Sequence, residues 1–286
     1  MHTDQHLAVV LAAAVLPAIA VEPRETSFDR TLNVTGPVDL EAATHAGSIA
    51  VRAGAGGSVR IHGVIRVNRN GREGEDYANL IREIQQNPPI HQAGNSIRIG
   101  AIAEDKARRG LSVSYAITVP EETNMRARSG AGAVAVDGLR GTADLSTGAG
   151  SVTAVRMGSG VRVRTGSGNI VLDAIRGGVD AHTGSGGIEG KSIAGPIVAR
   201  TGSGGIRLEE TAAAALKAHT GSGGIAVQLP ARAGFDVRAH TGQGGIRCAG
   251  VVAVRASGPV RSYDGKLRGG GPVVEVSTGS GGIRIE

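Results

Sequence analysis

The chain has few bulky or cross-linking residues. Its 286 residues include no Trp, two Phe, three Tyr and a single cysteine, Cys248, against 47 glycines. One cysteine excludes an intramolecular disulfide. Protein interiors are close-packed, so side chains this small can fill a core only where backbone layers lie near one another. The composition therefore excludes a wide globular core and favours a narrow stack of short coils.

Patterns that would mark an enzyme or a nucleic-acid-binding protein are also missing. The sequence contains no nucleophile elbow, no phosphate loop between a strand and a helix, and no zinc-ligand spacing. The net charge is +6 and the pI is near 10.1, but no dense Lys/Arg cluster is interleaved with aromatics, which argues against nucleic acid. A basic surface of this kind favours polyanions such as acidic glycans or membrane surfaces. We predict an envelope polymer, such as an anionic glycan, or a protein as partner. We predict no catalytic residue, no metal and no cofactor.

A glycine-rich repeat fills the C-terminal half of the chain. One copy, TGSGGIRL, begins at Thr201, and the other copies begin at Ser129, Thr147, Thr165, Thr183, Thr220, Thr241 and Thr278. From 129 to 201 the starts are 18 residues apart. A fixed period of this length is the signature of stacked repeats, so we predict an all-β solenoid with coils of roughly 18 residues. Positions are numbered below from the Thr or Ser that begins each copy, which is position 0.

Each copy contains two short alternating patterns. Apolar residues stand at −4 and −2 and again at +5 and +7, which predicts two strands per coil, because side chains alternate along a strand. A further apolar residue at +10 should point inward from one bend. Glycines at +1 and +3 should form the other bend, where a positive φ is needed. The Thr hydroxyls should bond inward to neighbouring backbone, and Ile188, Ile206 and Ile225 should form one internal column.

The N-terminal half is less regular. Residues 44–49 resemble a degenerate copy, so the solenoid should begin there, and residues 111–119 alternate strictly as one long strand. Between them, apolar residues at helical spacing predict one short helix near 73–86, which would flank the stack and cover a strand edge. We therefore divide the chain into an irregular region with the inserted helix at 21–128 and a regular solenoid at 129–286.

The first residues have the pattern of an export signal. The apolar run 7–20 is too short to span a bilayer and ends in the small-x-small sequence Ala18-Ile19-Ala20. We predict a signal peptide at 1–20 and a mature protein that is periplasmic, secreted or at the cell surface, with no transmembrane segment after signal removal.

The outward positions of the repeat carry the charges. At −3, Arg126, Asp144, Arg162 and Asp180 alternate in sign, which would help to fix the register. At −1 stand the residues of a possible basic binding stripe: Arg164, His182, Arg200, His219 and His240. In chain order His219 and His240 would be neighbours that could share a metal, but Arg200 separates them from His182, so a basic stripe is the preferred interpretation. The 37-residue interval before Thr278 predicts a second, degenerate coil around 256–259.

The serial TGSGGI copies, preceded by Tyr115-Ala116-Ile117-Thr118-Val119-Pro120 and an export signal, resemble the bacterial “putative adhesin” family of envelope β-solenoid domains, related to auto-transporter adhesin heads. The resemblance covers roughly residues 28–286. It implies a right-handed β-solenoid outside the cytoplasm with no assigned enzymatic activity and no catalytic residues to transfer. We predict a non-enzymatic, adhesin-like binding or structural module. The alternatives are a carbohydrate-active β-helix enzyme, which would need two close, unpaired carboxylates, and a protein-contact scaffold or sensor domain.

Overall fold

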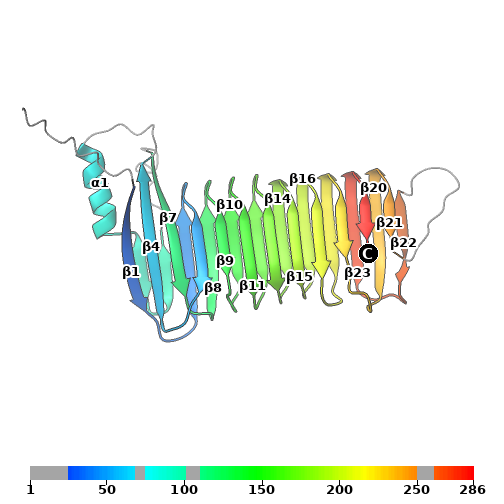
Figure 1. Ribbon diagram of the computed structural model, residues 1–286, viewed down its shortest axis with the longest axis horizontal. Helices are drawn as coiled ribbons and strands as arrows, with labels where there is room; N and C mark the ends of the chain where they lie inside the picture. The colour runs from blue at the N-terminus through cyan, green and yellow to red at the C-terminus, as the bar shows by residue number, and fades with distance from the viewer. Residues whose placement is uncertain (1–24, 68–74, 101–109, 250–260) are drawn as a thin grey trace, which may run out of the picture.

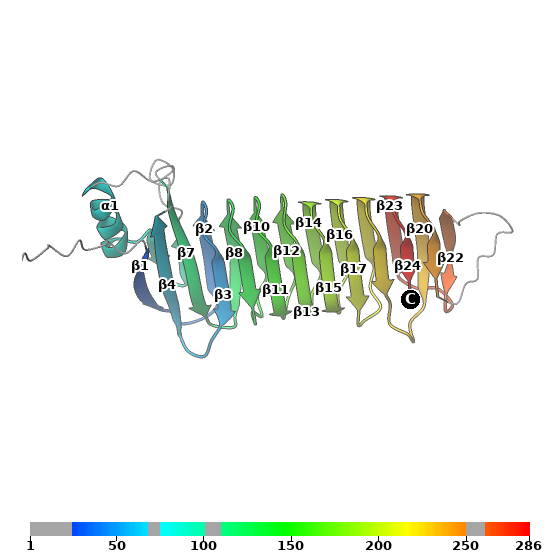
Figure 2. The same cartoon turned by 45° about the horizontal axis from the view of Figure 1, so that its top comes forward.

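The computed structural model describes residues 25–67, 75–100, 110–249 and 261–286. Its strands form two 12-stranded sheets along one long axis, which we call sheet A and sheet B (Figures 1 and 2). In the regular part of the chain successive strands alternate between the two sheets, so each repeat contributes one strand to each. This arrangement confirms the predicted β-solenoid. No helix among the described residues is both long and apolar enough to cross a membrane.

Each sheet brings together strands from distant parts of the chain. In spatial order, sheet A contains β1 (Glu25–Asn33), β4 (Ser58–Val67), β7 (Leu111–Val119), β3 (Ile49–Ala53), β9 (Val134–Asp137), β11 (Val152–Met157), β13 (Ile170–Ile175), β15 (Ile188–Ile193), β17 (Ile206–Glu210), β19 (Ile225–Gln228), β24 (Ile283–Ile285) and β21 (Ile246–Cys248). In the opposite sense along the stack, sheet B contains β22 (Ser262–Leu267), β20 (Phe235–Gln243), β23 (Val273–Ser280), β18 (Leu216–Ser222), β16 (Ile197–Ser203), β14 (Val179–Ser185), β12 (Val161–Thr165), β10 (Ala143–Thr147), β8 (Thr123–Ser129), β2 (Val38–Thr44), β6 (Ser96–Ile99) and β5 (Ile90–Ala93).

The core consists of side-chain columns that run along the stack. Ile188 pairs with Ile206 and Ile206 with Ile225, and each is only 2% exposed, which confirms the predicted internal column. The residues at +10 are also buried: Leu139, Met157, Ile175 and Ile193. Because identical positions lie over one another, small and branched side chains fill the narrow space between the sheets.

The threonines and glycines at the bend lie close to backbone carbonyl oxygens of the preceding coil. Thr201 is buried, and its hydroxyl donates to the carbonyl oxygen of Gly186 in the preceding coil (2.9 Å), as predicted for the whole column. Gly204, at +3, has a φ of 149°, and a Cβ there would lie 2.1 Å from the same oxygen. Gly202, at +1, does not have a left-handed φ, so our expectation for that position is wrong. A Cβ at Gly202 would instead lie 2.6 Å from the carbonyl oxygen of Gly184.

Coil order in space departs from chain order at the C-terminal end. β23 pairs with β18 on one side and β20 on the other, while β24 lies between β19 and β21. The last coil is thus inserted between the two before it, and the expectation of sequential stacking is wrong at this end. The copies present nearly the same side chains to their neighbours, so local pattern alone does not fix which copy stacks on which. The predicted degenerate coil around 256–259 lies outside the described residues.

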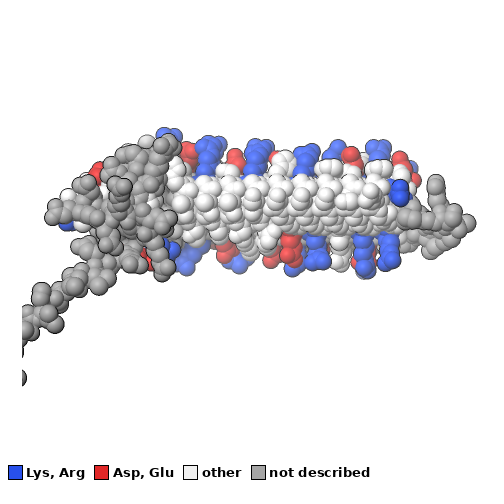
Figure 3. Space-filling model, turned by 90° about the horizontal axis from the view of Figure 1, so that it is seen from above, with Lys and Arg blue, Asp and Glu red and all other residues white. Residues whose placement is uncertain are grey.

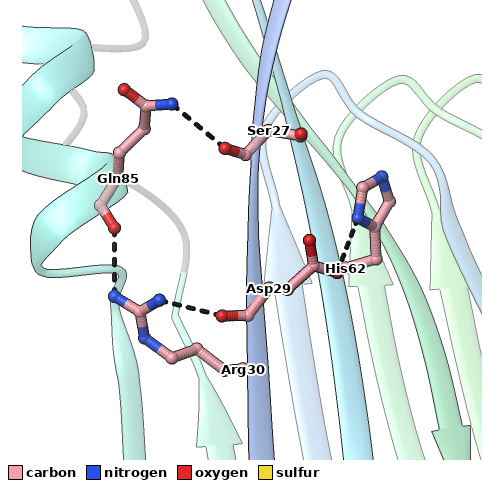
Figure 4. Close-up of polar contacts among 5 residues, drawn as sticks. All are labelled: Ser27, Asp29, Arg30, His62 and Gln85. Atoms are coloured by element: carbon pink, nitrogen blue, oxygen red, sulfur yellow. Dashed lines mark hydrogen bonds and ion pairs between the residues drawn. The ribbon is translucent and has the colours of Figure 1, made fainter.

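The N-terminal strands continue the stack and end under a helix. Thr44 is in register with Ser129, which places the degenerate copy directly beside the first regular one. Beyond it β7, β4 and β1 extend sheet A, and helix α1 (Glu75–Gln86) packs on β1, the last strand (Figure 4). Arg30 donates to the carbonyl oxygens of Gln85 (3.0 Å) and Gln86 (2.9 Å), which satisfies acceptors at the helix C-terminus. The predicted helix is confirmed, and it covers the edge strand of sheet A.

Candidate functional site

The predicted basic residues lie in one column on the outer face of sheet B. Their side chains point outward because position −1 alternates with the buried positions −2 and 0 on each strand. In spatial order the column runs Arg128, Ser146, Arg164, His182, Arg200, His219, Ser277, His240 and Ser262. No acidic residue belongs to this part of the column. Arg128 is a member that sequence reasoning omitted, although it stands at −1 of the Ser129 copy.

Four of the predicted residues lie on four consecutive strands, and the fifth does not. Arg164, His182, Arg200 and His219 follow one another from β12 to β18. Ser277 of the inserted β23 separates His219 from His240, and its hydroxyl lies 2.8 Å from Nδ1 of His219. The two histidines are therefore not neighbours, so the prediction of their adjacency is wrong. Among the described residues, no group of three or more His, Cys, Asp or Glu is arranged to hold a metal ion.

The neighbouring outward column carries charges of both signs. In spatial order it reads Arg98, Glu41, Arg126, Asp144, Arg162, Asp180, Val198, Lys217, Glu275, Arg238 and Asp264. Ion pairs join members of adjacent strands, among them Arg162 with Asp180 (3.3 Å) and Lys217 with Glu275 (2.9 Å). The predicted alternation at −3 is confirmed and extends well beyond the four residues first identified. Two of these acids also reach the −1 column, where Glu41 lies 3.5 Å from Arg128 and Asp180 lies 3.2 Å from His182. The −1 column still keeps an excess of positive charge, because it contains no acid of its own.

His182 shows the effect of this crowding. Burial of the ring lowers its pKa; the negative charge of Asp180 opposes the shift, and the positive charges of Arg200 and Arg164 add to it. Nε2 of His182 lies 2.9 Å from Nη1 of Arg200 and 3.2 Å from Oδ1 of Asp180, so it stands between a guanidinium that can donate to it and a carboxylate that can accept from it. At neutral pH the permanent charge of the column therefore comes from its arginines. Arg164 has no ion-pair partner in the described part of the chain.

The bend between the two sheets forms an uncharged edge along the molecule. Its exposed positions are the glycines at +1 and a serine column at +2, in which Ser185, Ser203, Ser222 and Ser280 are in register. Figure 3 looks onto this edge and shows an uncharged band between two rows of charged residues. We call it the glycine–serine edge. It separates the basic column on sheet B from the outer face of sheet A.

Acidic side chains on the outside of the coils are mostly engaged by cations. Asp137 pairs with Arg156, Glu189 with Lys191 (2.8 Å), and Glu121 with Arg140 (2.9 Å). One acid lies in the core instead: Glu210 is 3% exposed, its carboxylate oxygens have no hydrogen-bond partner, and burial raises its pKa to about 8. Sequence reasoning missed Glu210, because the repeat predicts inward residues at +5, +7 and +10, and Glu210 stands at +9.

A family model described as Toastrack DUF4097 matches residues 93–286. The chain belongs to this family. The match spans the regular coils together with the strands β6 to β8, so the Toastrack description covers both the basic column and the glycine–serine edge.

Two solved structures are similar to this Toastrack chain. One is described as a putative adhesin from Bacteroides fragilis, with 14% identity, coverage of 91% of this chain and 97% of the other, and a TM-score of 0.47. The other is described as a putative cell adhesion protein from Clostridium sporogenes, with 13% identity, coverage of 91% and 99%, and a TM-score of 0.29. No curated protein matches the chain.

Proposed function

We propose that this Toastrack protein is an exported, non-enzymatic module of the cell envelope that binds an anionic envelope polymer through the basic column. The observation that carries the proposal is the run Arg164, His182, Arg200 and His219 on four consecutive strands, with no acid among them. Adjacent strands lie about 4.8 Å apart, so the four side chains present a regular row of donors along the solenoid axis. A row of this kind suits a linear polymer that carries repeated negative charge.

Export is supported by the sequence of the N-terminus, and the rigid shape fits an extracytoplasmic role. The apolar run ending in Ala18-Ile19-Ala20 is typical of a signal peptide. Expression in a bacterium, followed by mass spectrometry of the product, tests this part of the proposal. The expected mature N-terminus is Val21 in the exported fraction; an intact chain that stays in the cytoplasm would contradict it.

The binding proposal is tested with labelled dextran sulfate, a polyanion without carboxylates, and with neutral dextran as the reference polymer. Binding should weaken strongly between about 0.1 M and about 1 M salt, because the Debye length falls from about 10 Å to about 3 Å. The double variant Arg164→Gln/Arg200→Gln should bind dextran sulfate roughly tenfold or more weakly, since it removes two charge-assisted contacts.

The matched control is Arg52→Gln/Arg60→Gln, which removes the same charge from the outer face of sheet A. An equal loss in both double variants would mean that net charge alone governs binding and would refute a role for the basic column. Breakdown of the polymer during the assay, detected as new reducing ends, would instead favour the carbohydrate-active alternative.

A further inference from the structure

A groove of about 1,100 Å³ runs along the outer face of sheet A beside the glycine–serine edge. It crosses β13, β15, β17, β19, β24 and β21, which is about 24 Å at a strand spacing of about 4.8 Å. The +4 residues form its floor: Asn169 and then Gly187, Gly205, Gly224, Gly282 and Gly245. The +6 residues on the same strands include Arg207, Arg284 and Arg247.

The fold does not require glycine on the floor of this groove. A Cβ built on Gly205 would lie 3.5 Å from the carbonyl oxygen of Gly224, an ordinary contact, and φ at Gly205 is outside the left-handed region. The same holds for Gly187, Gly224 and Gly282. By contrast, the neighbouring glycines at +3 have no room for a side chain. Earlier coils carry Ala133, Ser151 and Asn169 at +4, so other residues are compatible with the coil.

Because glycine has no side chain, the +4 glycines leave the backbone N–H groups of the next coil without a side-chain acceptor. Asn169 shows what a side chain at +4 does, because its Oδ1 accepts a hydrogen bond from the N–H of Gly187 in the next coil (2.9 Å). Ser114 does the same for Ser48 (3.1 Å). Where +4 is glycine no side chain reaches the next coil. The N–H groups of Gly205, Gly224 and Gly282 have no hydrogen-bond partner among the described residues, although the carbonyl oxygens of these glycines each accept from the sheet.

The charge beside this row of donors is positive. Arg207 and Arg247 are exposed and have no ion-pair partner in the described residues, while Arg284 pairs with Glu286. Glu189 is the one acid that lines the groove, and it lies directly beside Arg207 in the register of β15 and β17. Lys191 pairs with it (2.8 Å), and its pKa is lowered by the hydrogen bond from Lys191 and by the positive charges of Lys191 and Arg207. The groove thus combines backbone N–H groups with guanidinium groups, both of which are donors that recognise oxyanions.

We propose that this groove binds a linear polysaccharide with one carboxylate per sugar, laid parallel to the long axis of the solenoid. The N–H groups repeat at the strand spacing of about 4.8 Å, close to the repeat of an extended pyranose chain. An extended acidic peptide, whose side chains on one face repeat at about 6.6 Å, is the competing ligand that the experiment below includes. Single-stranded nucleic acid would need aromatic stacking surfaces, and the groove has none. The groove lies on the opposite sheet from the basic column, so the inference does not depend on the function proposed above.

The experiment restores the side chain that the glycines omit. In Gly205→Asn/Gly224→Asn each new side chain should cover the next N–H as Asn169 does, so the fold should persist while the groove closes. Binding of a galacturonate hexamer, measured by calorimetry, should weaken roughly tenfold or more. Asn169→Gly opens one further coil and should strengthen binding of the hexamer. The melting temperature of each variant, compared with the unaltered chain, shows that the fold is kept.

The control variant is Ser185→Asn/Ser222→Asn, which adds the same side chains at +2, outside the groove. It should bind the hexamer as the unaltered chain does. Unchanged binding by Gly205→Asn/Gly224→Asn would overturn the proposal, as would tighter binding of a neutral cellohexaose or of a hexaglutamate peptide than of the galacturonate hexamer. If Arg164→Gln/Arg200→Gln lost hexamer binding and Gly205→Asn/Gly224→Asn did not, the hexamer would bind at the basic column, and the proposal for the groove would be refuted.

Discussion

Glu210 provides the sharpest test of how the coils stack. Its carboxylate occupies the inward column at the place opposite Ile193, where the register shifts between β15 and β17. In the two preceding coils the residue at +9 has a left-handed backbone, with a φ of 54° at Ala174 and 53° at Ser192, and the residue after it points inward. Glu210 stands at +9 of its own coil and does not have a left-handed φ. One coil therefore turns a residue early and brings an acid into the core.

The energetic consequence depends on pH. The carboxyl has an ordinary pKa of 4.5 and a folded pKa of about 8. Below pH 4.5 both states hold the proton, and the full stability is present. As pH rises from 4.5 to about 8, only the unfolded state releases the proton, so stability falls by about 1.4 kcal/mol per pH unit and then levels off. The loss is about 3 kcal/mol at pH 7 and approaches about 5 kcal/mol above pH 9.

The variant Glu210→Gln removes the titration while keeping the shape of the side chain. Its free energy of unfolding in urea, minus that of the unaltered chain, should rise by about 4 kcal/mol between about pH 5 and about pH 9. Glu209→Gln, on the outward side of the same strand, should show no such rise. A difference for Glu210→Gln that stays flat across this range would refute the burial of an unpaired carboxyl at this position.

Three further predictions follow from the fold. Gly204→Ala should destabilise the protein by about 3 kcal/mol in chemical denaturation, because its methyl group would meet the carbonyl oxygen of Gly186, whereas Gly205→Ala should change stability by less than about 1 kcal/mol; equal effects would contradict the distinction between +3 and +4. Thr201→Val should lower the free energy of unfolding by about 1 kcal/mol, since it removes the hydroxyl that donates to Gly186; an unchanged midpoint in urea would count against that bond. Arg30→Ala should speed amide hydrogen exchange in α1 while leaving the regular coils unchanged, because it removes the donors at the helix C-terminus; unchanged exchange in α1 would show that apolar packing alone holds the helix.

Local sequence pattern was enough to predict the individual coil. The apolar positions, the inward threonines and the alternation from Arg126 to Asp180 all repeat with the period, and each was found where the pattern placed it. The alanine run before Leu216, a helix former by propensity, is irregular and leads directly into β18. The repeat prevails there because each coil must match the strand spacing of its neighbours.

Other features depend on contacts that the local pattern does not encode. The sequence by itself determined the two-strand coil, the buried columns and the residue types on each outer face, since these follow from spacing along the chain. Only the tertiary structure decided that the last coil lies between those of Thr220 and Thr241, that Glu210 faces inward, and that a groove with open N–H groups lies over sheet A. The physical reason is that near-identical copies can make the same hydrogen bonds and apolar contacts with one another in more than one stacking order. Long-range pairing and backbone hydrogen bonding therefore fix the order of the coils and the donors left free.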